Sequence, residues 1–415
     1  RNDGAHGVTR PTSHGLHFIL IHALSLLFMG AWFDLSAQTM SNSVPVSSVE
    51  FAIETWRSDN GLPQNTVTAL LQTRRGYIWA GTYNGVVEFD GVRFKVFDSS
   101  NFKGLANSRV TSLLEDSRGD IWIGHDTGEV SRHADGKFST VPLKAVLGRA
   151  PIKDFAEDES GDIWVLNQLG EALRIKDGLL FRPPALMAEN AFVNPRVTMD
   201  ASRRVYVVRN GVVARLTPRG YERVDFSDPS DRPYYYGLAA SRDGQVWVAG
   251  EGRVRKWNGT NWTADLGSFP EVDVSVTTML ETTSGRLLVG TLQRGLFGHD
   301  PVTGWFFLGH TNGLPQDWVW SLTEDREKNL WVGTGGGLAL LRERKVMMYS
   351  PPDDWQNRPV YSITRAQDGS VWAATEGAGI YRFDGTNWTH YGTEAGLANL
   401  FVWSLFEDSQ KQIWA

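Results

Sequence analysis

Cysteine is absent from the 415-residue chain, which excludes a disulfide framework, a thiolate metal site and a thiol nucleophile. Runs of basic residues are absent too, and the formal net charge of −6 argues against nucleic acid as the main partner. The motifs His-Glu-x-x-His and Gly-x-Ser-x-Gly and a phosphate-binding loop are also missing. Hydrophobic residues nevertheless make up 41% of the chain, so it can bury a core and is not disordered by composition.

Long apolar runs are scarce, and the longest lies near the start of the chain. Phe18–Trp32 is short for a membrane-spanning helix. It follows a polar segment that contains Arg1 and Arg10, and it precedes the small-residue exit Leu35-Ser36-Ala37. This order predicts that residues 1–37 are a secretory signal peptide, with an uncleaved N-terminal membrane anchor as the alternative. Residues 38–49 are predicted to be a linker, and either interpretation places the rest outside the cytoplasm.

Tryptophan and glycine are abundant instead, with 17 and 43 copies. A repeated stretch accounts for most of the tryptophan, and its clearest copy is Glu115–Gly124, where a polar turn leads into an aromatic strand that ends on a small residue. The aromatic position recurs every 41 to 43 residues, at Trp79, Trp122, Trp164, Tyr206, Trp247, Leu288, Trp331, Trp372 and Trp414. A fixed period of this size indicates a repeat architecture.

Each period is predicted to hold four short antiparallel strands. In the first unit these cover residues 67–71, 77–81, 86–89 and 94–97, and Asp90-Gly91 between the last two is a strong hairpin signal. The segments alternate with period two, which excludes a solenoid of helix pairs. Four strands in about 42 residues describe one blade of a β-propeller.

The fold is therefore predicted to be all-β, with a seven-bladed β-propeller at residues 50–350 followed by the first blades of a second propeller at 351–415. Phe51–Trp56 precedes the first complete unit and is expected to complete the seventh blade, which would tie the ends of the ring together. Val346–Tyr349 is expected to do the same for the second ring. Two blades cannot close a ring, so we interpret the sequence as a fragment of a longer protein.

A second sequence motif precedes four of the repeated stretches. Asn60-Gly61-Leu62-Pro63-Gln64 returns as Asn312-Gly313-Leu314-Pro315-Gln316, with weaker copies at residues 103–110 and 395–402. Followed by Asp-x-x-Gly-x-Ile-Trp-x-Gly-Thr and then Phe-Asp-Gly, this turn resembles the repeat of the two-component regulator propeller family. The resemblance covers about residues 50–415. Units three to six depart most from the pattern, since Leu166 and Val208 replace the small residue and Leu288 replaces Trp.

The resemblance implies an extracytoplasmic, periplasmic sensor. Members of the family usually have two seven-bladed propellers, followed by a further β domain, a membrane helix and a cytoplasmic histidine kinase or diguanylate cyclase. The parts that follow the propellers are not present in this sequence. It implies a small-molecule ligand and a homodimer formed through the full-length protein, with the membrane reached through a segment outside this chain. It implies no catalytic residue, metal or cofactor in this stretch.

The loops between the second and third strands are the candidate ligand site. In a propeller these loops open on the same face as the loops that join blades, and here their contents differ from unit to unit. Amides, an arginine and carboxylates around a central mouth suit a carbohydrate or an anionic compound, although ordinary solvated loop residues are the alternative interpretation. The predicted ligand-binding residues are Tyr83, Asn84, His125, Asp126, Asn167, Gln168, Arg209, Asn210, Glu251, Gln293 and Arg294.

Other repeated residues have structural interpretations. The Trp row is predicted to pack between neighbouring blades rather than to bind sugars. The Asp before each turn (Asp116, Asp158, Asp325 and Asp408) is predicted to cap that turn rather than to hold a metal.

Two further functions stay open at this point. A secreted propeller lyase or glycosidase is one: His125 with Glu251 is the only candidate acid/base pair for a lyase, and Arg209 and Arg294 lack the third loop arginine that a glycosidase of the Tyr-nucleophile kind needs. A protein-interaction scaffold is the other.

Overall fold

The computed structural model describes residues 51–143, 147–183, 195–209, 211–224, 235–250, 252–271, 274–344, 355 and 358–415. The predicted signal peptide (1–37), the linker (38–49) and the strand Val346–Tyr349 lie outside these residues. The chain divides into two compact units, Arg1–Arg344 and Lys345–Ala415, which are described separately. No helix among the described residues is long and apolar enough to cross a membrane.

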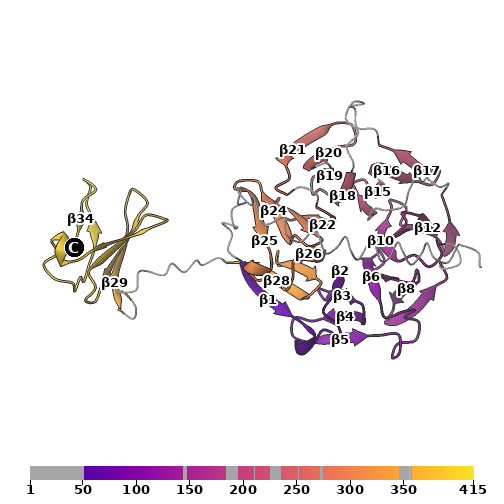
Figure 1. The fold of residues 1–415 in the computed structure, drawn as a ribbon, viewed down its shortest axis with the longest axis horizontal. Coiled ribbons are helices and arrows are strands. Elements are labelled where there is room, and N and C mark those ends of the chain that lie inside the picture. The colour runs from indigo at the N-terminus through magenta and orange to yellow at the C-terminus, as the bar shows by residue number, and fades with distance from the viewer. Residues whose placement is uncertain are drawn as a thin grey trace, which may run out of the picture. The chain divides into compact units, whose positions relative to one another are not determined.

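Seven four-stranded antiparallel sheets form a closed ring in the first unit (Figure 1). We number these blades in chain order. Blades 1 to 3 consist of β2 (Val67–Gln72), β3 (Ile78–Thr82), β4 (Gly85–Phe89) and β5 (Phe94–Phe97); β6 (Val110–Glu115), β7 (Ile121–His125), β8 (Val130–Ala134) and β9 (Lys137–Val141); and β10 (Ile152–Glu157), β11 (Ile163–Asn167), β12 (Ala172–Lys176) and β13 (Leu179–Phe181).

Blades 4 to 7 follow the same order of strands. They consist of β14 (Arg196–Met199), β15 (Val205–Arg209), β16 (Val212–Thr217) and β17 (Gly220–Arg223); β18 (Tyr235–Ala240), β19 (Val246–Gly250), β20 (Arg253–Trp257) and β21 (Trp262–Ser268); β22 (Val276–Glu281), β23 (Leu287–Thr291), β24 (Leu296–Asp300) and β25 (Gly304–Leu308); and β26 (Val319–Glu324), β27 (Leu330–Thr334), β28 (Gly337–Glu343) and β1 (Phe51–Trp56). The 3₁₀ turns η1 (Ser58–Asn60) and η2 (His310–Asn312) precede blades 1 and 7.

The first strand of each blade lies innermost and contacts the first strands of the blades on either side, including β26 with β2. The all-β prediction is confirmed. Two Asp-Gly pairs form two-residue hairpins: Asp135 and Gly136 both have positive φ, as do Asp177 and Gly178. At Asp90-Gly91 a hairpin also forms, but its connection runs over the four residues between Phe89 and Phe94, and only Gly91 has positive φ.

Ring closure occurs through β1, as predicted. The strand pairs antiparallel with β28, in a register that runs from Phe51 opposite Glu343 to Trp56 opposite Leu338. At the end of this ladder the Trp56 ring stacks on Trp331, with 5.5 Å between ring centroids. The first and last parts of the unit therefore share one sheet, and the outer side of β28 is not left as a bare edge.

In the first unit the repeated tryptophans are buried core residues that lie between blades, as predicted, whereas Trp414 of the second unit is exposed. Trp79 of blade 1 is buried in one cluster with Val110 and Ile121 of blade 2, and Trp331 of blade 7 is buried with Ile78 of blade 1. The small residue two positions after the Trp lets neighbouring blades approach closely. A Cβ added to Gly124 would lie only 2.7 Å from the Ile152 side chain of the next blade.

The repeated aspartate closes its own turn and also binds the tryptophan. In blade 2, Asp116 Oδ1 accepts hydrogen bonds from the backbone N–H groups of Arg118 (2.9 Å) and Asp120 (3.0 Å), and Oδ2 accepts the Trp122 indole N–H at 2.9 Å. The same indole bond occurs at Asp158, Asp325 and Asp408. The predicted capping role is confirmed, and the indole bond adds a link between turn and core that the pattern alone did not indicate.

We predict that Asp116→Ala lowers the free energy of unfolding by about 2 to 3 kcal/mol, because two backbone N–H groups and a buried indole N–H lose their acceptor. Asp116→Asn is the matched variant. It keeps an acceptor for the turn but cannot serve both sets of donors, so we expect a smaller loss. Urea unfolding followed by tryptophan fluorescence measures both. A loss within about 0.5 kcal/mol, as at an ordinary surface position, would contradict the prediction.

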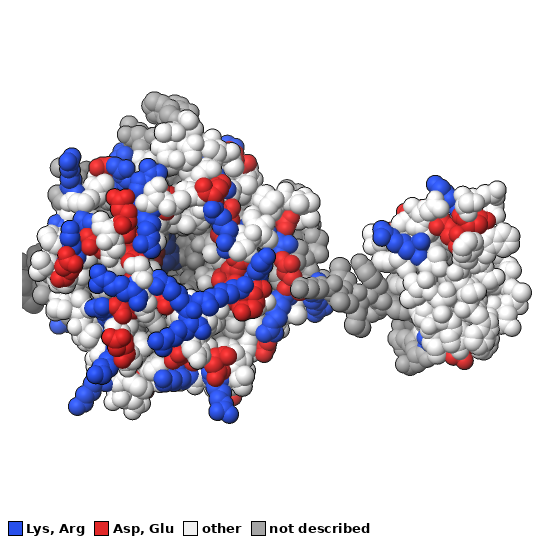
Figure 2. Space-filling view, turned by 180° about the vertical axis from the view of Figure 1, so that it is seen from behind, with Lys and Arg blue, Asp and Glu red and all other residues white. Residues whose placement is uncertain are grey.

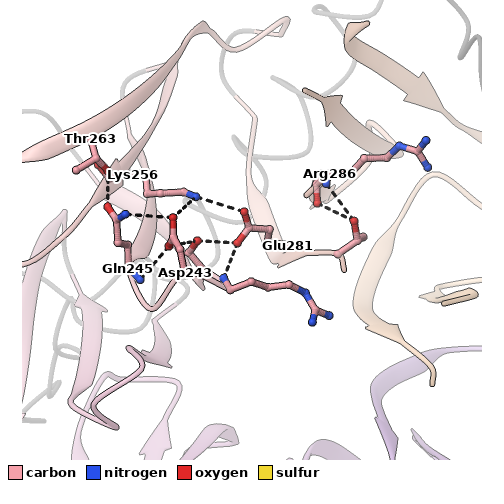
Figure 3. Close-up of polar contacts among 9 residues, drawn as sticks. Asp243, Gln245, Lys256, Thr263, Glu281 and Arg286 are labelled. Atoms are coloured by element: carbon pink, nitrogen blue, oxygen red, sulfur yellow. Dashed lines mark hydrogen bonds and ion pairs between the residues drawn. The ribbon is translucent and has the colours of Figure 1, made fainter. Parts of the chain in front are cut away.

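A second polar contact joins each of several blades to the next. The residue that ends an inner strand accepts a backbone N–H from the turn of the preceding blade. Figure 3 shows one such junction, where Glu281 accepts the Arg242 backbone N–H (2.7 Å) and the Ser241 hydroxyl (2.6 Å), and its carboxylate also lies 3.4 Å from Lys256 Nζ. Among the described residues of the first unit, five junctions have this bond: Arg326 to Gln72, Arg74 to Glu115, Ser117 to Glu157, Arg242 to Glu281, and Thr283 to Glu324.

The second unit repeats these features on a smaller scale. It contains one four-stranded sheet, β29 (Val360–Arg365), β30 (Val371–Thr375), β31 (Ile380–Phe383) and β32 (Trp388–Tyr391), then η4 (Thr393–Ala395) and the pair β33 (Phe406–Glu407) and β34 (Ile413–Trp414). The Gln367 backbone N–H donates to Glu407 at 2.9 Å, and the Thr364 hydroxyl donates to the Leu405 carbonyl at 3.1 Å. These are the junction contacts of the first unit. One complete sheet and one partial sheet do not by themselves show a second ring.

Candidate functional site

The loops between the second and third strands lie on the same face as the entries to the inner strands. In blade 2 the Asp126 N–H donates to the Arg109 carbonyl (3.1 Å), one residue before β6. Gln168 donates to Pro151 (2.8 Å) and Leu292 to Ser275 (2.9 Å) in the same way. We call this side of the ring the loop face. Its exposed loops are held to rigid strands by backbone hydrogen bonds, which is how a scaffold positions a variable binding surface.

Three of the predicted ligand residues are not in these loops, which corrects the prediction of their place. His125, Asn167 and Arg209 are the last residues of β7, β11 and β15, and they are buried. They occupy the position held elsewhere by the buried threonines Thr82, Thr291 and Thr334. Each of these hydroxyls donates to a glycine carbonyl at or directly before the start of the following strand.

These buried side chains support the loop from inside the blade. Asn167 Oδ1 accepts the backbone N–H groups of Leu169 (3.0 Å) and Glu171 (2.9 Å). His125 Nε2 lies 2.9 Å from Ser131 Oγ, and burial lowers the pKa of the imidazole to about 4, so it is neutral at physiological pH. The signal was present in the sequence: all three residues fall three positions after the aromatic residue, where the motif has Thr.

The remaining described candidates do reach the surface of the loop face. Tyr83 and Asp126 are partly exposed, whereas Asn84, Gln168, Gln293 and Arg294 are exposed. The structure brings Arg294 to Glu271, with Nε 3.6 Å from the carboxylate. Asn210 and Glu251 lie outside the described residues.

Arg109 contacts two of the candidates, Tyr83 and Asp126, and was not among the residues predicted from the sequence. Its guanidinium lies over the Tyr83 ring, 4.3 Å from the centroid, and forms an ion pair with Asp126. Burial raises the pKa of the Tyr83 hydroxyl, an effect that the Arg109 charge opposes. Arg109 stands in the blade-joining loop directly before β6, and such loops share the loop face, so its position was the available signal. Together the three side chains present a hydroxyl, a guanidinium and a carboxylate across the junction of blades 1 and 2.

A cavity lies on the ring axis, enclosed by the inner strands of all seven blades. Its volume is about 320 Å³, which is within the range of pockets that hold small molecules. Its lining is mostly Thr, Ser, Ala and Leu, and its charged residues are Lys153 and Asp154 of β10 and Arg196 of β14. Asp154 and Arg196 pair with corresponding residues of their second strands, Leu166 and Val208, so they lie at the same level on adjacent blades.

Burial is the largest influence on the pKa values of Lys153, Asp154 and Arg196. Burial lowers the pKa of the Lys153 ammonium to about 7, with the Arg196 charge lowering it further and Asp154 opposing. Burial likewise raises the pKa of Asp154, which accepts the backbone N–H groups of Phe155 (3.0 Å) and Val197 (3.3 Å). Two cations therefore share one carboxylate in a confined space. Figure 2 shows further Lys, Arg, Asp and Glu side chains around the middle of the ring on one face.

Metal chemistry finds no support in the described part of the chain, where no group of three or more His, Asp or Glu side chains could hold an ion. The lyase candidate His125 has no exposed surface, and its proposed partner Glu251 lies outside the described residues.

Comparison with known proteins agrees with the repeat pattern. The profile of the two-component regulator propeller matches residues 61–84, 104–127 and 313–336, which fall on blades 1, 2 and 7. The chain carries repeats of the two-component regulator propeller family. The three matched blades are consecutive in the ring, since blade 7 lies next to blade 1. No curated protein sequence matches the chain.

Solved structures share the fold of this regulator propeller. The extracellular domain assigned to the hybrid two-component system BT3049 of B. thetaiotaomicron is 18% identical with a TM-score of 0.65, and the match covers 88% of this chain and 52% of that one. The chain thus spans about half the length of that domain. A streptogramin B lyase is 15% identical with a TM-score of 0.58, covering 71% and 98%. Virginiamycin B lyase of Staphylococcus aureus is 13% identical with the same TM-score, covering 71% and 100%. At these identities the likeness establishes the fold alone.

Proposed function

We propose that the chain is the ligand-sensing part of an extracytoplasmic, periplasmic two-component sensor, which passes ligand binding to a downstream kinase or cyclase. The observation that carries this is the family repeat on blades 1, 2 and 7, in a ring whose loop face presents different polar side chains from blade to blade. The extracellular domain of BT3049, which belongs to a system of this class by its description, shares the fold over most of this chain.

In this proposal the ligand is a small polyhydroxylated or anionic molecule bound on the loop face. The side chains that would contact it are Tyr83, Asn84, Asp126, Gln168, Gln293 and Arg294, with Arg109 added by the structure. Ligand binding would change how propellers pack in a homodimer, and that change would reach a membrane helix outside this chain. The ligand must bind one arrangement more tightly than the other, since otherwise no signal is transmitted. Residues 345–415 would begin a second propeller, consistent with the repeated junction contacts.

A panel of neutral and acidic oligosaccharides tests the proposal by thermal shift and calorimetry on the chain without residues 1–37. We expect one class to bind, and we predict that Arg109→Ala weakens that binding at least tenfold, because it removes the charge that links Tyr83 to Asp126. Arg93→Ala is the matched control, since Arg93 is exposed beside the Asp90–Gly91 hairpin. Binding that is lost equally in both variants, or turnover of the oligosaccharide by the isolated protein, would overturn the sensing proposal.

A further inference from the structure

The charged residues that line the axial cavity are not balanced. Lys153, Asp154 and Arg196 stand on the adjacent inner strands β10 and β14, so the lining holds two cations against one carboxylate. Arg196 Nε has no hydrogen-bond partner among the described residues. Buried polar groups are nearly always hydrogen-bonded, so a guanidinium without this bond beside a cavity requires an explanation.

Lys153 is a second and independent anomaly at the same place. At the second residue of the inner strand, blades 1, 2 and 6 have a threonine whose hydroxyl donates to a carbonyl of the next blade. These bonds are Thr68 to Val110 (2.7 Å), Thr111 to Ile152 (2.6 Å) and Thr277 to Val319. Blade 3 has Lys153 instead. Substituting a buried ammonium for a bonded hydroxyl is costly for the fold, and it places a cation beside Arg196 rather than beside a second carboxylate.

We propose that the axial cavity of the first unit is a binding site for a small oxyanion, a carboxylate or phosphate group on a molecule of about monosaccharide size. The oxyanion lies between Lys153 and Arg196. Asp154 keeps its two backbone donors and offsets one of the two positive charges. This site is separate from the loop-face ligand of the proposed function and does not depend on it.

The charge balance of the cavity favours an anion over a neutral ligand. With Lys153 protonated, two cations face one carboxylate, and the other strand segments that line the cavity contribute no charged side chain. An oxyanion accepting charge-assisted hydrogen bonds from both cations would neutralise the excess. Sulfate, phosphate and carboxylate groups all fit this chemistry, so the experiment must separate them.

Isothermal titration calorimetry with glucuronate, inorganic phosphate and glucose tests the proposal on the whole chain. We expect glucuronate or phosphate to bind and glucose not to bind, and the better of the two probes identifies the source of the oxyanion. Arg196→Met is expected to weaken binding at least 100-fold.

Arg215→Met is the matched control, because Arg215 lies on β16 of the same blade, two strands outward from β14, and pairs with Glu222 away from the cavity. The proposal is overturned if neither anion binds below millimolar concentration, or if Arg215→Met weakens binding as much as Arg196→Met does. Failure of any oligosaccharide to bind the loop face would leave these outcomes unchanged, so the two proposals fail separately.

The pH dependence gives a second measurement. The titratable groups that face the cavity are Lys153 and Asp154, and Arg196 stays charged. Because the pKa of Lys153 is about 7 in the empty cavity, its protonated fraction rises about tenfold between pH 8 and pH 6. We expect the affinity for glucuronate to rise about tenfold over this range, with proton uptake on binding. In Lys153→Met this dependence should vanish, and an unchanged pH profile in that variant would contradict the assignment.

Discussion

Removal of residues 1–56, and with them strand β1, is expected to open the ring and lower the free energy of unfolding by more than about 5 kcal/mol. The loss combines the whole ladder from Phe51 to Trp56 with the stacking of Trp56 on Trp331. It also leaves β28 as an unpaired edge, so we expect the shortened protein to associate as well as to unfold at lower temperature.

The chain that begins at residue 50 is the control, since it keeps β1 and loses only what precedes it. Trp56→Ala is a milder companion. It keeps the ladder but removes an aromatic ring that lies 5.2 Å from Phe89 and 5.5 Å from Trp331, for an expected loss of about 2 to 4 kcal/mol. Calorimetry and size-exclusion chromatography measure both effects. Equal melting temperatures for the chains that begin at residues 50 and 57 would show that the ring closes without β1.

Lys153→Met is expected to stabilise the protein, which is the reverse of what most core substitutions do. The gap between a pKa of about 7 in the folded chain and the ordinary value of 10.5 sets an upper bound of about 5 kcal/mol on the destabilisation by this charge. Because the side chain is only partly buried, we expect a gain of about 2 kcal/mol at pH 6.

The sign of the pH dependence follows from the same comparison. Below about pH 7 the lysine is charged in both the folded and the unfolded chain, and the full cost is present. Between about pH 7 and 10.5 the unfolded chain holds the proton and the folded chain does not, so the stability of the wild type rises with pH. The advantage of Lys153→Met should therefore be greatest at pH 6 and should shrink toward pH 10.

Thermal unfolding at pH 6, 8 and 10 measures this advantage. Lys256→Met is the matched control with the opposite sign. That lysine is also largely buried but lies 2.9 Å from the Asp243 carboxylate and near Glu281, so its loss should destabilise the protein (Figure 3). A destabilised Lys153→Met at pH 6, or an advantage that grows with pH, would show that the lysine is paired in the folded protein.

The fold was largely predictable because its signals are local and repeated. Two-residue alternation indicates the strands, and Asp-Gly pairs mark the hairpins at Asp135-Gly136 and Asp177-Gly178. The strand that precedes the first unit has one free position in the ring, beside β28. The aspartate caps followed from spacing alone, since Asp116 and the N–H groups it binds are within four residues of each other. These features need no knowledge of how blades face one another.

The candidate site was less predictable because it depends on which way a side chain points. His125, Asn167 and Arg209 were assigned to loops, although their alignment with Thr82 places them one residue inside the strand. Lys153 was missed for a different reason. Inner strands such as β2, β6 and β10 have a register shift after their first residue, so simple alternation no longer tells which side chains face the axis. Only comparison with Thr68 and Thr111 at the same step marks the lysine as unusual.

The junctions between blades are not equivalent, because among the described residues two of the seven lack a hydrogen bond that the other five have. Blade 4 has Met199 and blade 5 has Ala240 where five other blades have a Glu or Gln that binds the preceding turn. Bulkier Leu166 and Val208 also replace the small residue on the two adjoining second strands. Blade 4 keeps other contacts, such as Arg203 with Glu157, but in the described part of the chain it lacks this bond at both of its junctions. We therefore expect its amides to exchange with solvent before those of blades 1 and 7. Since Arg196 belongs to blade 4, an anion bound on the axis would stabilise the blade whose junctions have the fewest of these bonds.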